Sequence, residues 1–166
     1  MKVPHVPAGH NAVSPYLVTQ DAEQVICMLH EVFGGEEIHR SLRPDGTIRH
    51  AEVRIEDSVI MIGEASGEFP AMPCMLHVYV PDCDATHARA RSFGLETLRE
   101  PETQPWGDRS AGVRDGAGNQ WWFATHVEDV GERRRVGHHQ RRPVGGAHHR
   151  IAQVAGVGPL HADGAD

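Results

Sequence analysis

Residues 50–62, which read HAEVRIEDSVIMI, hold the pattern that decides the fold. Polar and apolar side chains alternate from His50 to Ile55, and a period of two is typical of a strand with one buried face. Glu56-Asp57 then predicts a tight turn, and the apolar run Ser58–Ile62 predicts the returning strand. We therefore expect a β-hairpin whose two faces differ in chemistry.

A strand and a helix are predicted to precede this hairpin. Residues 14–19 favour a strand, and Asp21 is suited to cap the next helix, with Gln24 three positions later completing a capping box. Apolar residues then recur at helical spacing until Gly34-Gly35, which ends the helix. A further strand and a turn at Pro44-Asp45-Gly46 complete a βαβββ unit.

The same order of elements recurs in the second half of the chain. An offset of 60 places Phe33-Gly34 on Phe93-Gly94, and an offset of 61 places Gly46 on Gly107. The one-residue drift falls in loops, where insertions are tolerated. We therefore predict an α+β fold in which two βαβββ units form a curved mixed sheet around a cavity, with the helices on its convex face.

Composition divides the chain into three parts. Residues 1–13 are predicted to be a flexible leader, residues 14–130 the paired βαβββ domain, and residues 131–166, rich in Arg, His and Gly, a disordered tail. Residues 1–130 carry 10 Lys or Arg against 20 Asp or Glu, within a whole-chain net charge of −7. Because phosphate binding needs a basic face, this acidic body argues against nucleic acid as a partner.

The chain also lacks the signals of a membrane or secreted protein. No apolar run approaches the length of a membrane span, and residues 1–13 contain no apolar signal core. The three cysteines, Cys27, Cys74 and Cys83, are odd in number and lack CxxC spacing. This pattern predicts a reducing compartment, and we expect a cytoplasmic protein with no membrane partner.

Strand parity separates a core face from a second face with unusual chemistry. A solvated sheet face would be rich in Lys, Thr and Ser, whereas this one mixes aromatic residues and Met with a few polar groups, as small-molecule sites do. The alternative is a dimer interface or a second packing layer. The predicted cavity residues on the strands are Tyr16, His50, Glu52, Arg54, Met61, Met75, His77, Tyr79 and Trp122.

Several segments together resemble the vicinal oxygen chelate superfamily, the group of glyoxalases, bleomycin-resistance proteins and extradiol dioxygenases, and its PhnB-like branch in particular. The resemblance covers about residues 13–130, and it implies paired βαβββ modules that curl around a cavity. The segments that carry it are Ser14–Val18, Phe33-Gly34-Gly35, His50–Ile55, Asp57-Ser58-Val59, Trp106–Arg109 and Asn119–His126.

The resemblance also predicts where a metal ion would be held. Metal enzymes of this superfamily place a His or Glu ligand on each of four strands, and the corresponding positions here are Ser14, Met61, Met75 and Trp122. None of these side chains is a good ligand for a divalent metal. The resemblance therefore implies a protein that has neither a metal ion nor another cofactor. It would bind a small molecule, as the drug-binding members of the superfamily do.

An enzyme remains the alternative to a binding protein. His50 and Glu52 lie two residues apart on one strand face, so they could act as a general acid and base in a glyoxalase-type lyase or isomerase. Together with His77 they could also form an unorthodox metal site, since His and Glu suit zinc. Residue types alone do not decide between these roles and ordinary hydrogen bonding.

Two further residues beside a turn are candidates for the ligand site. Arg109 follows Trp106, and an Arg beside an aromatic ring can bind a carboxylate or phosphate. The alternative for Arg109 is a structural ion pair with Asp108 or Asp115. Cys83 lies near a predicted helix N-terminus, which can lower a thiol pKa, but no base adjoins it in the sequence.

The predicted apolar face also suggests the state of assembly. An open sheet that carries Tyr16, Met61, Met75, Tyr79 and Trp122 would leave a large apolar patch in water, which monomers rarely do. A twofold partner would cover that face and the sheet edges. We therefore expect a homodimer.

Overall fold

The computed structural model describes residues 3–130, and the predicted tail 131–166 lies outside the described residues. Residues 3–13 hold no helix or strand. The elements that follow are β1 (Tyr16–Thr19), α1 (Ala22–Phe33), β2 (Glu36–Leu42), β3 (Ile48–Ile55), β4 (Ser58–Glu64), β5 (Met75–Tyr79), α2 (Cys83–Phe93), β6 (Glu96–Thr103), β7 (Asp108–Arg114) and β8 (Gln120–His126).

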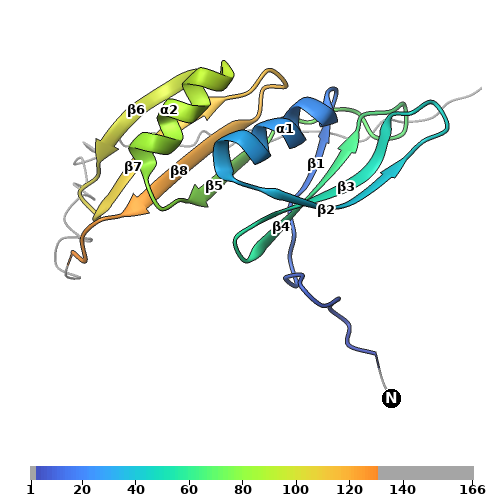
Figure 1. Ribbon diagram of the computed structural model, residues 1–166, viewed down its shortest axis with the longest axis horizontal. Coiled ribbons are helices and arrows are strands. Elements are labelled where there is room, and N and C mark those ends of the chain that lie inside the picture. The colour runs from blue at the N-terminus through green and yellow to red at the C-terminus, as the bar shows by residue number, and fades with distance from the viewer. Residues whose placement is uncertain (1–2, 131–166) are drawn as a thin grey trace, which may run out of the picture.

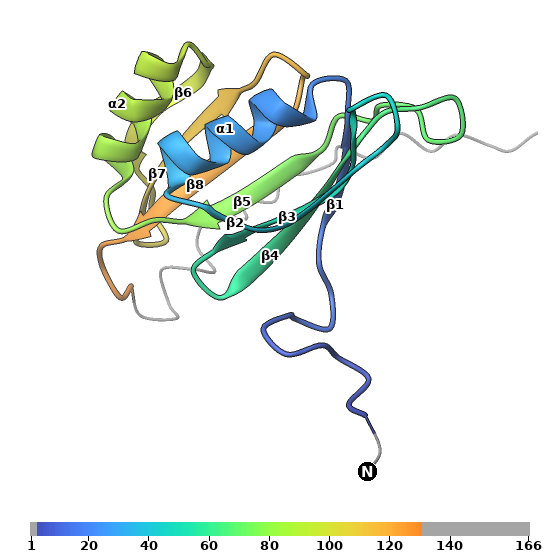
Figure 2. The same cartoon turned by 45° about the vertical axis from the view of Figure 1, so that its right-hand side comes forward.

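The predicted repeat of two βαβββ units is confirmed. The strands form two four-stranded sheets, ordered β1-β4-β3-β2 in the N-terminal module (16–64) and β5-β8-β7-β6 in the C-terminal module (75–126). In each sheet the first and last strands of the unit pair in parallel and the other pairs are antiparallel. Both helices lie on the same side of the molecule (Figures 1 and 2). We call the opposite surface of the two sheets the helix-free face.

Side-chain caps at the start and glycines at the end set the bounds of both helices. Oδ1 of Asp21 accepts a hydrogen bond from the backbone N of Gln24 at 3.0 Å, and Asp82 caps α2 in the same way. Gly34 and Gly94 end the helices with φ of +70° and +96°, a left-handed conformation that glycine adopts without steric cost. No helix among the described residues has the length and apolarity needed to cross a membrane.

Strand parity predicts most of the core correctly. Ala51 and Val53 of β3 and Trp121 and Phe123 of β8 are at most 1% exposed. Val59, which parity places on the opposite face, is also buried, although it does not belong to the core cluster.

The two modules share one hydrophobic core, which is joined at the helices. The ring of Phe33, at the end of α1, packs against Trp121 and Phe123 of the other module, with ring centroids 5.7 and 5.8 Å apart. Nε of Arg89 in α2 donates a hydrogen bond to the carbonyl oxygen of Val32 at 3.0 Å. Figure 2 shows α1 lying between α2 and the strands of its own module.

Candidate functional site

The helix-free face of the N-terminal module carries a chain of polar contacts centred on Glu52. Nε2 of His50 lies 3.2 Å from Oε1 of Glu52, and Nδ1 of the same ring lies 3.2 Å from the hydroxyl of Tyr16. Nε2 of His10 lies 3.0 Å from the other carboxylate oxygen of Glu52. The hydrogen bond from His50 lowers the pKa of Glu52 and, with His10, outweighs the effect of partial burial.

The leader places His10 in this chain of contacts by lying along the β3–β4 hairpin. Nδ2 of Asn11 donates a hydrogen bond to the carbonyl oxygen of Asp57 at 3.2 Å, and Gly9 lies against the guanidinium of Arg54. This role of His10 is not predictable from the sequence, because a segment without periodicity has no register that would place it opposite Glu52.

A cavity of about 750 Å³ adjoins this cluster. Tyr16 and His50 line one side, and Phe69 of the segment that links the modules lines another. Gly63 keeps the Tyr16 ring close to β4, because a Cβ at that position would lie 3.1 Å from the tyrosine hydroxyl. The volume lies within the range of known small-molecule pockets.

The helix-free face of the C-terminal module is built around Asp108, which is buried. Its carboxylate accepts hydrogen bonds from the Tyr79 hydroxyl at 3.3 Å and from Nε1 of Trp106 at 3.1 Å, and Nδ1 of His126 lies 2.7 Å from Oδ1. Burial favours a higher pKa for Asp108, but the hydrogen bonds, first of all that from His126, bring it below its usual value. His77 and these aromatic residues line a cavity of about 490 Å³.

Trp122 forms a flat platform on the same module. Gly112 lies directly beneath its indole, where a Cβ would approach the ring to 2.8 Å. The guanidinium of Arg99 lies 4.8 Å from the ring centroid, a distance typical of a cation–π contact. Nε1 donates to Oε1 of Gln120 at 3.3 Å, so the orientation of the half-buried ring is fixed.

The predicted site residues fall into two groups, one for each module. Met61 pairs in register with both Tyr16 and Glu52, so it lies within the first group. Met75 is 66% exposed on β5, the strand that carries His77 and Tyr79 of the second group. Arg54 lies beside the first group, where its Nη1 is 3.8 Å from a carboxylate oxygen of Glu36.

Arg109 does not reach the helix-free face. Its guanidinium forms a two-point ion pair with Asp84 in the first turn of α2, where Nη2 lies 2.6 Å from Oδ1. The ion-pair partner of Arg109 is thus Asp84 rather than the predicted Asp108 or Asp115, and its contact with a ligand stays a prediction. The reason is the alternation of β7, which directs Asp108 toward one face and Arg109 toward the helix on the other.

The structure also bears on the predicted chemistry at Cys83 and at the His/Glu set. Burial raises the pKa of the Cys83 thiol to about 11, so its place near a helix start does not make it reactive. His50 and Glu52 lie in one module and His77 in the other. No group of three His, Cys, Asp or Glu side chains that could hold a metal ion occurs within residues 3–130.

Comparison with known proteins places this geometry in context. The family model described as Glyoxalase/Bleomycin resistance protein/Dioxygenase superfamily matches residues 8–123. Over 133 residues the chain is 32% identical to the uncharacterized protein Rv0887c of Mycobacterium tuberculosis (strain H37Rv), an alignment that covers 72% of this chain and 76% of that relative.

Two solved structures share the fold. TioX from Micromonospora sp. ML1 is 26% identical, with a TM-score of 0.60, and the match covers 70% of this chain and 99% of TioX. TnmS3, an antibiotic binding protein from Streptomyces sp. CB03234, is 22% identical, with a TM-score of 0.55, over 71% of this chain and all of that one. At 22% identity the second match shows the fold alone.

Proposed function

Because the chain belongs to the glyoxalase/bleomycin resistance protein/dioxygenase superfamily, we propose that it binds a small amphipathic molecule on its helix-free face without a metal ion. The observation that carries this proposal is the exposure of large apolar side chains beside two cavities. Tyr16 is 50% exposed, Tyr79 61% and Trp106 45%. Aromatic rings held in this way offer contact area and stacking at little cost in side-chain entropy.

The two groups of residues suggest different roles toward one ligand. Trp122, Tyr79 and Trp106 would hold its flat apolar part, because hydrogen bonds to Gln120 and Asp108 fix the orientation of these rings. The His50–Glu52 pair would orient a polar group through hydrogen bonds. A planar molecule with one polar end therefore fits this chemistry best.

The donor set supports a metal-free protein. At the positions where the superfamily's metal enzymes carry ligands, Ser14 is neutral, Met61 and Met75 offer only a soft thioether, and the Trp122 indole offers no lone pair. These residues do not fit a divalent metal. We expect purified protein to contain much less than one equivalent of any transition metal, which elemental mass spectrometry would measure.

A thermal-shift screen with planar antibiotics and other amphipathic aromatics tests the binding function. A ligand present at 100 times its dissociation constant would add about 2.7 kcal/mol to the stability. For any compound that binds, we expect Trp122→Ala to weaken binding by about 1–3 kcal/mol. Arg109→Gln, on the helix side, serves as the control and should leave affinity unchanged. Equal losses in both variants would place the ligand elsewhere.

An enzymatic function is the second candidate, favoured by the 3.2 Å contact between Nε2 of His50 and Oε1 of Glu52 beside the larger cavity. Such a pair could move a proton in a glyoxalase-type lyase or isomerase reaction. Turnover of glutathione hemithioacetals that is lost in Glu52→Gln but kept in Trp122→Ala would favour catalysis over simple binding.

We also propose that the protein is a cytoplasmic homodimer. A twofold partner seated on the helix-free face would cover Met75 and Tyr79, which are both more than half exposed. Cys27, Cys74 and Cys83 are free thiols, as is usual in a reducing compartment. Light scattering at micromolar concentration should give twice the 18.2 kDa of one chain, and a mass of one chain would contradict the dimer.

A further inference from the structure

Residues 7–10 of the leader form a tight turn that presents His10 to the helix-free face. The backbone N of His10 donates a hydrogen bond to the carbonyl oxygen of Pro7 at 3.2 Å, and Gly9, at the third position of the turn, has a φ of +79°. Turns with a positive φ at that position favour glycine, which adopts it without steric cost. Nδ1 of His10 lies 3.3 Å from the carbonyl oxygen of Ala8, so the turn also orients the imidazole ring.

The side chain of His10 is largely covered, although its neighbours in the leader are exposed. Residues 7–9 and 11–13 are exposed, whereas only 17% of the His10 side chain is. Its Nε2 lies 3.0 Å from Oε2 of Glu52, whose side chain is 15% exposed. Figures 1 and 2 show the leader leaving β1 on the side away from both helices. The imidazole thus covers one oxygen of the carboxylate at the centre of the N-terminal polar cluster.

The rest of the leader is attached weakly to the module. Within the described part of the chain, residues 3–13 pair with no strand. Asn11 adds one exposed hydrogen bond to the carbonyl oxygen of Asp57, and Gly9 lies against the guanidinium of Arg54. A segment with few buried contacts opens at a low cost in free energy. The turn can therefore leave the sheet without unfolding it.

The two imidazoles that hold Glu52 differ in how easily they can be replaced. His50 belongs to β3 and is held on both sides, because its ring nitrogens lie 3.2 Å from Oε1 of Glu52 and 3.2 Å from the Tyr16 hydroxyl. The hydrogen bonds from His50 and His10 lower the pKa of Glu52, so its carboxylate is ionised at neutral pH. A partly buried charged oxygen is costly without a donor. Whatever replaces His10 must therefore donate to Oε2.

We propose that residues 7–11 are a displaceable strap, and that the ligand that displaces it carries a cationic nitrogen donor, such as an amidinium, imidazolium or ammonium group, at its polar end. That group replaces the His10 imidazole on Oε2 of Glu52, because charge-assisted hydrogen bonds are about twice as strong as neutral ones. The adjoining cavity beside Tyr16 and Phe69 leaves room for the part of the ligand next to it. This inference rests on the proposed function, since it specifies the polar end of the same ligand.

The probe for this test is benzamidine, a planar amidinium on a small apolar ring, with benzoate as its anionic counterpart. Backbone-amide NMR titrations use the full-length protein, with EDTA present to exclude binding through a metal ion. A closed strap weakens the apparent affinity, so we expect His10→Ala to bind benzamidine about tenfold more tightly than wild type, the effect of one hydrogen bond to a charged group. His5→Ala, at an exposed position of the leader, is the matched control and should leave the affinity unchanged.

A second pair of variants tests the carboxylate with the strap already released. In the His10→Ala background, Glu52→Gln keeps an acceptor oxygen but removes the charge, and it should weaken benzamidine binding about tenfold. Glu36→Gln removes a charge from the same module, at a carboxylate 3.8 Å from Arg54, and should change the affinity less than about twofold.

Displacement of the strap has its own signature. The heteronuclear NOE of the amides in residues 7–11 reports motion on the picosecond to nanosecond timescale. We expect it to fall when wild type is saturated with benzamidine, and to be low in His10→Ala before any ligand is added. An unchanged value at saturation would show that the strap stays in place, and the proposal would then be wrong.

Three further outcomes would overturn the proposal: equal affinities in His10→Ala and wild type, equal binding of benzoate, or no saturable shift at millimolar benzamidine in His10→Ala. The proposed function is judged separately, by whether screened compounds depend on Trp122. A compound that needs Trp122 but is insensitive to His10→Ala and Glu52→Gln would leave that function standing and refute only the strap.

Discussion

α1 and α2 occupy the same place in their modules but bury different side chains. α1 buries a fully apolar stripe, whereas α2 buries small and polar groups. The C-terminal module instead obtains its core from the large rings of Trp121 and Phe123 on β8, against which Phe33 of the other module packs. The comparison shows that one topology can place its apolar volume on the helix or on the strand, provided that the shared junction is filled.

On the helix-free face, the N-terminal module is the more polar of the two and the C-terminal module the more apolar. In the N-terminal module, His10 from the leader covers Glu52, and the carboxylate is held by two imidazoles. In the C-terminal module, the buried carboxylate of Asp108 lies below Tyr79 and Trp106, whose rings remain about half exposed or more. The first face is thus arranged for polar orientation and the second for apolar contact.

The largest expected effect concerns the adjacent tryptophans of β8. Trp121 is fully buried and its Nε1 donates to Asp115, so Trp121→Ala should lower the free energy of unfolding by about 3–5 kcal/mol. Trp122 lies half-buried on the other face, and Trp122→Ala should lower it by less than about 1 kcal/mol. Urea denaturation of both variants measures the difference, and equal losses would refute the division of faces.

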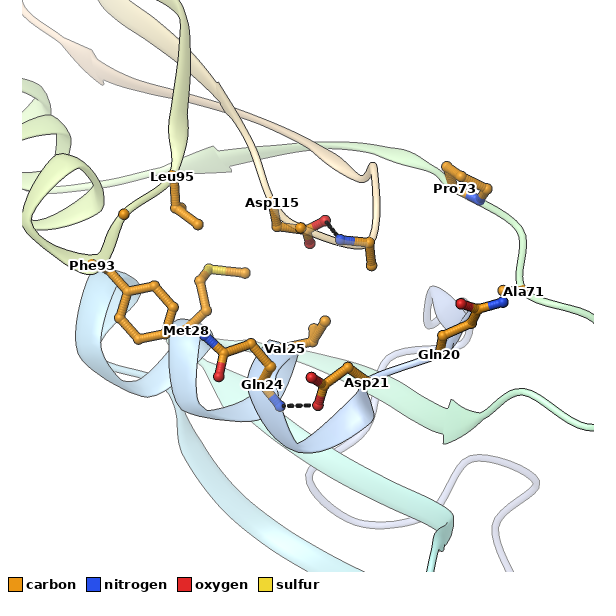
Figure 3. Close-up of a pocket in the computed structure, with 13 residues that line it drawn as sticks. Gln20, Asp21, Gln24, Val25, Met28, Ala71, Pro73, Phe93, Leu95 and Asp115 are labelled. Atoms are coloured by element: carbon orange, nitrogen blue, oxygen red, sulfur yellow. Dashed lines mark hydrogen bonds between the residues drawn. The ribbon is translucent and has the colours of Figure 1, made fainter.

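A smaller effect is expected where the modules exchange aromatic contacts. Phe33 packs against two rings of the C-terminal core, whereas Phe93, at the corresponding helix end, borders an open cavity of about 620 Å³ between the modules (Figure 3). We expect Phe33→Ala to cost about 2–3 kcal/mol and Phe93→Ala about half as much, because a side chain next to open space leaves less of a new void. Thermal unfolding followed by circular dichroism would compare them. A larger loss in Phe93→Ala would reverse this assignment.

The smallest effect is the pH dependence that His126 gives to the C-terminal module. The hydrogen bond to Asp108, and then that to Asp129, raises the pKa of His126 above its ordinary value. Protonated His126 therefore stabilises the fold fully below the unfolded-state pKa of about 6.5, and this contribution is lost as the pH rises through the higher folded-state pKa. The melting temperature of His126→Gln should fall below that of wild type at pH 6 and approach it at pH 9. A constant difference across that range would exclude the linkage.

Local patterns in the sequence predict much of this architecture, because they depend on near neighbours. The cap at Asp21 and the buried positions of β3 follow from spacing alone. β6 (Glu96–Thr103) is harder to predict from spacing, because register shifts interrupt its pairing with β7.

The candidate site is less predictable, because its partners are distant in the sequence. The pairing of Arg109 with Asp84 depends on how α2 packs against β7, and the contact of His10 with Glu52 depends on the path of the leader. Neither is encoded in a local period. Strand alternation predicts which side chains share a face of the sheet. Which of those side chains contact each other depends on how the helices and strands pack.

The contact of Phe33 with β8 can form only late in the synthesis of the chain. The N-terminal module leaves the ribosome first, and all its strand pairings lie within residues 16–64. Until Trp121 and Phe123 are synthesised, however, the end of α1 lacks the rings that cover it. The nascent chain therefore leaves the apolar end of α1 uncovered until the second module has been translated, and transiently exposed apolar surface of this kind favours aggregation.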